Sequence, residues 1–159
     1  MECFQVVENG EGIEASIRRK LTARGGLRGR CANGRHPALL VVSPRAAAGR
    51  KLDGVCRTVL LPGEVGFWME GLQAASAVSY GVSSRDSLTI SSREEERLWV
   101  ALQRELVTVE GQVVERQEFP LLLERGAEAL PALAAAGALL LLGVPPEELY
   151  GDGSRGRLS

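Results

Sequence analysis

Three short runs of apolar residues, separated by glycine, proline and charged residues, constrain the fold of this chain most. They lie within Pro37 to Pro44 (ALLVV), Cys56 to Gly63 (CRTVLLPG) and Ala75 to Gly81 (ASAVSYG). Because these runs lack a regular apolar and polar alternation, each is typical of a strand covered on both faces, as strands of parallel sheets are. With helical or loop connections between them, the runs predict an α/β region with a parallel sheet, in which residues 37–44 form a central strand.

The N-terminal segment predicts one further strand followed by a helix. Cys3 to Glu8 is a short apolar stretch that leads into N-G-E-G, a strong turn signal. From Ile13 onwards, apolar residues recur every four positions among basic residues, which is the pattern of an amphipathic helix. We expect this helix to end near Gly25 and Gly26, within a loop rich in glycine and arginine.

The pattern changes after the last of the apolar runs. Before that point, residues 45–54 form a polar or weakly helical connection, and a helical turn is expected around Phe67 to Ala74. From Asp86 to Leu123 apolar and polar residues alternate or mix, and V-E-G-Q around Gly111 is a tight connection. This second half of the chain predicts an antiparallel meander or hairpin.

A long apolar stretch near the C-terminus predicts a buried helix. Ala129 to Gly143 contains Pro131 and Gly137 and is shorter than the roughly 18 to 20 apolar residues that a membrane span requires. A chain of 159 residues has room for one ordinary domain. We therefore predict a single, three-layer-like α/β domain over residues 1–150, with a mainly parallel sheet in its first half, the antiparallel meander and the buried C-terminal helix. Residues 151–159 are predicted to form a flexible tail.

Charge balance and cysteine usage argue against several classes of partner. Nineteen basic and twenty acidic residues give a net charge of -1, so no global positive field attracts nucleic acid or an anionic membrane. The cysteines form no C-x-x-C pair and His36 is the single histidine, so neither a metal site nor a cofactor is predicted. The first residues lack the pattern of a secretory leader, and we take the cysteines as free thiols, so the expected location is cytoplasmic.

Four segments match the order of elements in a known family. They are ALLVVSP at Ala38 to Pro44, VSYGVSSRDSLTISS at Val78 to Ser92, the predicted strands between Leu98 and Leu123, and the alanine-rich and leucine-rich stretch with L-G-V at Ala129 to Leu149. In this order they resemble the later part of the central domain of Mur ligases, the ATP-dependent amide-forming enzymes of peptidoglycan synthesis. The resemblance implies an ATP-binding loop at the start of the domain.

The loop that the resemblance implies lacks its key side chains. Family members bind ATP with a G-T-N-G-K-(T/S) loop, whose amides cradle the phosphates, whose lysine neutralises their charge and whose hydroxyl holds magnesium. The nearest candidate here is the turn Asn9, Gly10, Glu11 and Gly12. Glu11 stands in the place of the lysine and Gly12 in the place of the hydroxyl residue, and a carboxylate repels phosphate. We predict that this degenerate phosphate loop does not bind ATP as the family does.

A second family signature is also altered. The family motif G-x-H-N-x-x-N, which precedes the alanine-rich helix, supplies a histidine and an asparagine that contact the nucleotide. The matching positions in this chain hold Ala127, Glu128 and Pro131. The resemblance with these departures implies an abbreviated and catalytically inactive relative, a pseudoenzyme without a cofactor.

Two functional hypotheses follow from the sequence. The first is a non-catalytic binding or assembly module that acts through a homo-oligomer or a protein partner, because the meander strands and the apolar last helix offer interface surface. The second is a small-ligand or nucleotide-binding enzyme with a pocket at the carboxyl ends of the parallel strands. The predicted lining residues of that pocket are Ser43, Arg45, Gly63, Glu64, Tyr80 and Ser83.

Overall fold

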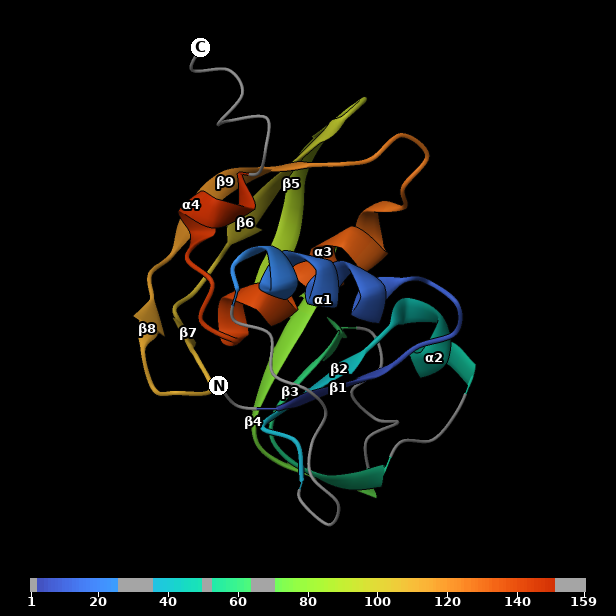
Figure 1. Cartoon of the computed structure of the whole chain (residues 1–159), viewed down its shortest axis with the longest axis vertical. Coiled ribbons are helices and arrows are strands. Elements are labelled where there is room, and N and C mark those ends of the chain that lie inside the picture. The colour runs from blue at the N-terminus through green and yellow to red at the C-terminus, as the bar shows by residue number, and fades with distance from the viewer. Residues whose placement is uncertain (1–2, 26–35, 50–52, 64–70, 151–159) are drawn as a thin grey trace.

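A seven-stranded sheet curls around one helix in the computed structural model of the chain (Figure 1). The structure describes residues 3–25, 36–49, 53–63 and 71–150. The predicted α/β fold with a mainly parallel first half is confirmed. In their order across the sheet, the strands are β1 (Phe4–Val7), β2 (Leu39–Val42), β3 (Asp53–Pro62), β4 (Gly71–Gly81), β5 (Leu88–Glu94), β6 (Arg97–Leu102) and β9 (Gln117–Leu122).

Strands β1 to β5 pair in parallel, each with the next along the chain. All four residues of β2 are buried, as expected for a central strand covered on both faces. The same expectation is wrong for the start of the run Ala75 to Gly81, because Ala75 to Ala77 are exposed in β4. β4 begins at Gly71, so the helical turn expected around Phe67 to Ala74 is wrong from Gly71 onwards, and residues 67–70 lie outside the described part. The reason is a long-range one: residues 71–74 pair with residues 53–56 of β3, which the local pattern does not signal.

The predicted antiparallel meander is confirmed in the second half of the chain. β5 and β6 form a hairpin, and β9 pairs antiparallel with the other side of β6. The segment between β6 and β9 forms a small separate hairpin of β7 (Leu106–Val107) and β8 (Val113–Val114). Its tight turn includes Gly111, whose φ of 92° lies in the left-handed region that favours glycine.

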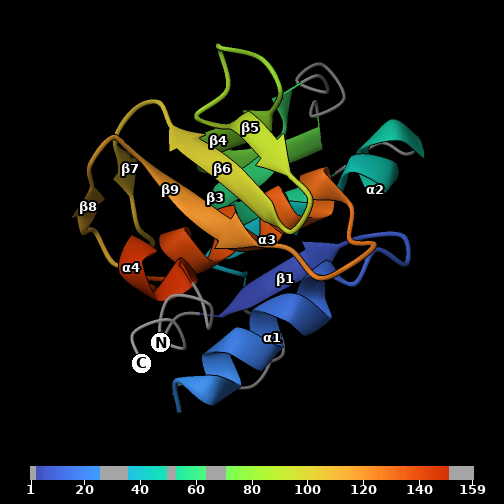
Figure 2. The ribbon, with the colours of Figure 1, turned by 90° about the horizontal axis from the view of Figure 1, so that it is seen from above.

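Two helices pack on the concave face of the sheet and form the main core. α1 (Ile13–Ala23) and α3 (Ala129–Leu141) contact each other there, and Figure 2 shows α3 in the middle of the curve. From its second turn onwards α3 is buried, so the expectation that this helix offers interface surface is wrong. The sheet lies so close that a Cβ on Gly137 would be 3.0 Å from Leu88 and 3.1 Å from Leu60.

The opposite face of the sheet carries a smaller apolar cluster under α2 (Pro44–Gly49). Alternate residues of β2 point to the two clusters, which is the side-chain alternation of a strand. The three-layer-like arrangement therefore holds over β2 and β3. A short fourth helix, α4 (Pro146–Leu149), packs against β9. The buried residues of the smaller cluster are Leu40, Val42, Ala47, Cys56, Val59 and Leu61.

The cysteines differ from the expectation of free thiols. Cys3 is disulfide-bonded, so that expectation is wrong for this residue, whereas Cys56 is free and buried. Burial raises the pKa of the Cys56 thiol. The cytoplasmic location loses the support of free thiols and stays a prediction. Among the helices that the structure describes, none has the length and apolar character to cross a membrane.

Candidate functional site

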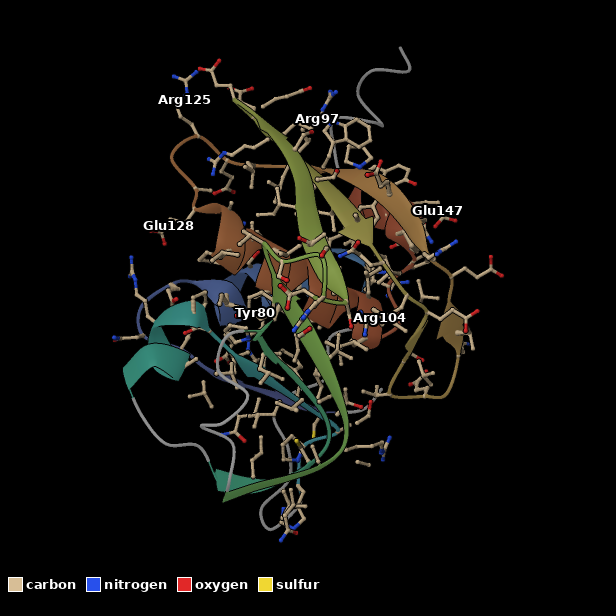
Figure 3. All side chains as sticks on the ribbon, turned by 180° about the vertical axis from the view of Figure 1, so that it is seen from behind. Tyr80, Arg97, Arg104, Arg125, Glu128 and Glu147 are labelled. Atoms are coloured by element: carbon tan, nitrogen blue, oxygen red, sulfur yellow. The ribbon has the colours of Figure 1, made fainter. Side chains whose placement is uncertain are left out.

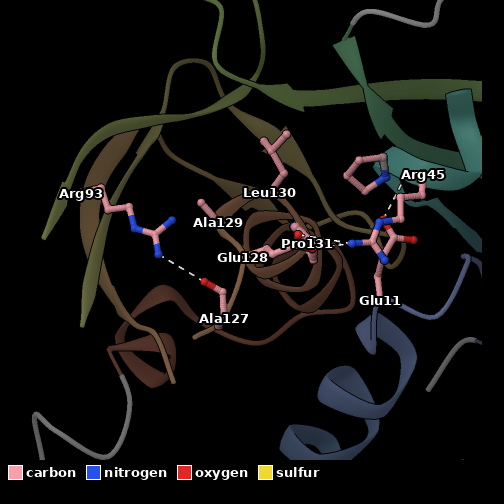
Figure 4. A pocket seen from close by; sticks show the side chains of 9 residues that line it. Glu11, Arg45, Arg93, Ala127, Glu128, Ala129, Leu130 and Pro131 are labelled. Atoms are coloured by element: carbon pink, nitrogen blue, oxygen red, sulfur yellow. Dashed lines mark hydrogen bonds and ion pairs between the residues drawn. The ribbon is translucent and has the colours of Figure 1, made fainter. Parts of the chain in front are cut away.

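The turn before α1 and the first turns of α2 and α3 meet at one cavity near the carboxyl ends of β1 and β2 (Figure 4). α1 starts directly after Gly12, α2 at Pro44 and α3 at Ala129. The cavity has a volume of about 460 Å³ and adjoins a wider groove of about 1020 Å³ between α1 and the end of β9. The residues that line the cavity are Glu11, Pro44, Arg45, Arg93, Ala127, Glu128, Ala129, Leu130 and Pro131.

The Glu11 carboxylate turns inward and accepts hydrogen bonds from two separate loops. Its Oε1 accepts from the backbone amide of Asn9 and its Oε2 from the backbone amide of Arg45, both at 3.0 Å. The hydroxyl of the buried Ser43 is also hydrogen-bonded to this carboxylate. Burial by itself would raise the pKa of Glu11, but these hydrogen bonds and the charge of Arg45 outweigh it and lower the pKa. Glu11 is therefore an anion at neutral pH and occupies donors that an external anion would need.

Glu8 occupies a second set of donors at the start of α1. Its Oε1 accepts from the amide of Ile13 at 2.8 Å, and its Oε2 accepts from the amide of Glu14 at 3.0 Å. These first amides of a helix have no partner within the helix and are the groups that bind anions. Gly10 and Gly12, with φ of 74° and 77°, provide the left-handed turns between Glu8 and the helix. The anion-binding end of α1 is thus capped by the chain itself.

Tyr80 is fixed in the interior next to this site. Its side chain is fully buried and its hydroxyl donates to the Val42 carbonyl at 2.5 Å. Burial, and to a lesser extent the negative charge of Glu11, raise the pKa of Tyr80 far above its usual value. Figure 3 shows Tyr80 inside the molecule, away from the peripheral Arg125. Tyr80 therefore serves as a structural donor to the end of β2 and offers no surface to a ligand.

Two arginines and the start of α3 form the other side of the cavity. The Arg45 guanidinium pairs with the Glu128 carboxylate at 3.3 Å, and Arg93 of β5 donates to the Ala127 carbonyl at 3.2 Å. Glu128 is the residue before α3, and no side chain caps that helix end. The cavity therefore combines two guanidinium groups with a lining of alanine, leucine and proline side chains.

Of the five predicted ligand-binding residues that lie in the described part of the chain, Arg45 lines this cavity and the other four do not. Arg45 lines the cavity, whereas Ser43 lies behind it, fully buried, where its hydroxyl oxygen accepts from the first turn of α2. Gly63 and Ser83 are not among the residues that line the cavity; Gly63 directly follows β3, and Ser83 lies in the turn after β4. Glu64 lies outside the described residues.

A buried carboxylate holds the ends of β3 and β4 together. Asp86 accepts a hydrogen bond from the amide of Ser83 at 3.1 Å and is 5% exposed. A Cβ on Gly63 would lie 1.9 Å from one of its oxygens, and a Cβ on Gly81 would lie 2.5 Å from the other. This carboxylate therefore needs glycine at both positions. The predicted ligand residues Gly63 and Ser83 lie beside it and are themselves exposed.

The turn Asn9 to Gly12, predicted to be a degenerate phosphate loop, lies between β1 and α1. Glu11 of this turn lines the same cavity as Ala127, Glu128 and Pro131, the positions that the resemblance aligns with its second signature. Sequence reasoning missed Glu8 and Arg93. For Glu8 the available signal was an acidic residue just before a turn into a helix, whereas Arg93 lies in the charged stretch SSREEER, which indicates only an exposed hairpin.

Within the described part of the chain, no group of three or more His, Cys, Asp or Glu side chains is placed to hold a metal ion. The chain matches no protein-family model and none of the curated proteins with which it was compared, so its function must be argued from the geometry of this site.

Proposed function

We propose that this chain is a non-catalytic binding or assembly module, resembling an inactive Mur ligase central domain. The observation that carries the proposal is the position of the Glu11 carboxylate. It lies in the loop where a phosphate-binding relative would hold its nucleotide, and it accepts hydrogen bonds from the backbone amides of Asn9 and Arg45. A residue of the chain itself thus takes the place of the phosphate. The site therefore differs from a phosphate-binding loop in two ways: it lacks the lysine, and its backbone donors are already hydrogen-bonded to Glu11.

The electrostatics of the site oppose a nucleotide phosphate. A phosphate that entered the loop would meet the charge of Glu11 at short range, and at 4 Å such a repulsion is worth about 4 kcal/mol at an effective dielectric constant near 20. It would also have to displace Glu8 from the amides of Ile13 and Glu14. The two carboxylates therefore leave no donor set at the start of α1 that is ready for an anion.

The second signature supports the same reading. Ala127, Glu128 and Pro131 line the cavity at the positions where the family carries its nucleotide contacts. Alanine and proline side chains offer no hydrogen-bond donor. Glu128 is negatively charged and already paired with Arg45. These three positions therefore supply none of the nucleotide contacts that the resemblance implies.

Isothermal titration calorimetry with ATP and with inorganic phosphate, each with and without magnesium, tests the proposal. We expect no saturable heat for the wild-type chain. Glu11→Ala frees the amides of Asn9 and Arg45, so this variant should acquire weak phosphate binding, whereas Glu95→Ala, which removes a carboxylate from an exposed hairpin turn, should remain silent. Saturable ATP binding by the wild-type chain would refute the proposal. Silence of Glu11→Ala would show that this carboxylate is not what keeps phosphate out.

A second candidate function is a small-ligand-binding protein or enzyme that uses the same cavity. The observation that favours it is the cavity of about 460 Å³, which combines apolar lining with the guanidinium groups of Arg45 and Arg93. A thermal-shift screen with ADP, UDP-sugars and small carboxylates would detect such a ligand. A hit that persists in Arg93→Ala would place the ligand elsewhere, and a hit lost in Arg93→Ala would favour this candidate over the first.

A further inference from the structure

The N-terminal part of β4 is paired with another strand on one side only. Residues 71–81 pair with β3 along nearly their whole length, but β5 pairs with β4 only at Tyr80 and Gly81. In the strand register, no residue of another described strand lies beside Gly71 to Ser79 on the side that faces away from β3, and the Ser79 hydroxyl oxygen, at the end of this stretch, accepts a hydrogen bond from the amide of Ser87 at 3.3 Å. Because the sheet curls away towards β5, nine residues of β4 form an open edge, which we call the β4 edge.

The β4 edge carries none of the features that protect an open strand. Its sequence, GLQAASAVS, contains neither a charged residue nor proline. Five consecutive side chains, Gln73 to Ala77, are exposed, so both faces of the strand are open there. Long, uncharged edges of this kind are templates for pairing with another strand.

The other open edges of the sheet differ in this respect. The outer strand β9 contains Glu118 and Pro120, and proline removes a donor from the edge. The part of β5 beyond its contact with β4 carries Arg93 and Glu94. The outer strand β1 has only four residues. Among the described strands, β4 is thus the one that offers a long edge with neither charge nor proline.

We propose that two copies of this chain pair through their β4 edges, antiparallel and about a two-fold axis. This inference names the partner for the assembly role proposed above and rests on that role. A second copy fits because antiparallel pairing of one edge with itself is self-complementary, and no charge of either copy is buried by it. Centred on Ala75, the pairing aligns Gly71 with Ser79 and forms about eight to ten backbone hydrogen bonds.

The side chains around the axis allow this approach. Ala74, Ala75, Ser76 and Ala77 are small, so the two strands meet without steric conflict on either face. The sheet of one copy would continue into the sheet of the other.

Sedimentation velocity of the full chain over a range of concentrations tests the pairing. We expect a dimer for the wild-type chain, with a dissociation constant raised about tenfold or more in Ala75→Lys and in Ala75→Glu, because like charges then lie directly opposite each other. An equimolar mixture of the two variants should dimerise again, because opposite charges then face each other. Ala23→Lys adds the same charge at an exposed alanine of α1 and should dimerise like the wild-type chain.

Circular dichroism melts of each variant show whether it folds. Dimer formation in the equimolar mixture is a second control, because two unfolded chains would not recover it. A wild-type chain that stays monomeric at its highest soluble concentration would overturn the inference. A dimer whose dissociation constant is unchanged in both Ala75→Lys and Ala75→Glu would also overturn it. A monomer that also fails to bind ATP would leave the non-catalytic proposal standing. A dimer that binds ATP would refute that proposal and leave the β4 pairing intact.

Discussion

Removal of the Glu11 carboxylate is the sharpest test of how the site is held together. Glu11→Ala leaves three donors without their acceptor: the amides of Asn9 and Arg45 and the hydroxyl of Ser43. Asn9 is exposed, so water can replace its hydrogen bond, but Ser43 is fully buried and cannot be rehydrated without rearrangement. Hydrogen bonds to a charged acceptor contribute about 1.5 to 3 kcal/mol each, at the lower end where the group is partly exposed.

Counting the Arg45 and Ser43 bonds at the lower end, we expect Glu11→Ala to lower the free energy of unfolding by about 3 kcal/mol. For a chain of this size that corresponds to a melting temperature lower by about 6 to 12 °C. Urea denaturation followed by circular dichroism measures the difference. Glu95→Ala, in an exposed hairpin turn, is the matched control and should change stability by less than about 0.5 kcal/mol. A loss for Glu11→Ala no larger than that of the control would refute the account of the site.

The same variant predicts a pH dependence. The pKa of Glu11 is lowered from 4.5, so the folded state binds its proton less readily than the unfolded state does. The stability that Glu11 contributes is therefore fully present above the unfolded value and is lost as the pH falls through the folded pKa. The difference between wild type and Glu11→Ala should be constant above about pH 6 and shrink below pH 4.5. A difference that grows on acidification would contradict this sign.

Three further substitutions test the packing. Gly137→Val should lower the free energy of unfolding by about 2 to 3 kcal/mol in urea denaturation, because even its Cβ meets leucine side chains at 3.0 and 3.1 Å. Gly81→Ala should cost about 1 to 3 kcal/mol, and the cost should fall by more than about 0.5 kcal/mol in the Asp86→Ala background if the 2.5 Å approach to that carboxylate is its cause. Tyr80→Phe should cost about 1 to 2 kcal/mol by thermal unfolding, since the carbonyl of Val42 loses its donor, and an unchanged melting temperature would argue against that hydrogen bond.

The sequence by itself determined the elements whose signals are local. The apolar runs at β2 and β3 predicted buried parallel strands, because a strand covered on both faces needs apolar side chains in both directions. The four-residue spacing of Ile13, Ile17 and Leu21 predicted α1, and these are the residues that α1 buries. The turn between β1 and α1, which contains the acidic residue Glu11, was also readable from its N-G-E-G sequence.

Only the tertiary structure decided what that acid does. The Glu11 carboxylate accepts a hydrogen bond from the amide of Arg45, which is 34 residues away in the chain. Arg93 and Glu128, which come much later in the sequence, complete the lining of the cavity beside it. The open edge of β4 likewise depends on where β5 leaves the sheet. Local patterns record which face of an element is buried, because burial follows side-chain periodicity. The packing of the whole chain decides which separate elements contact each other. These long-range contacts do not follow the periodicity of the side chains, so no local sequence pattern predicts them.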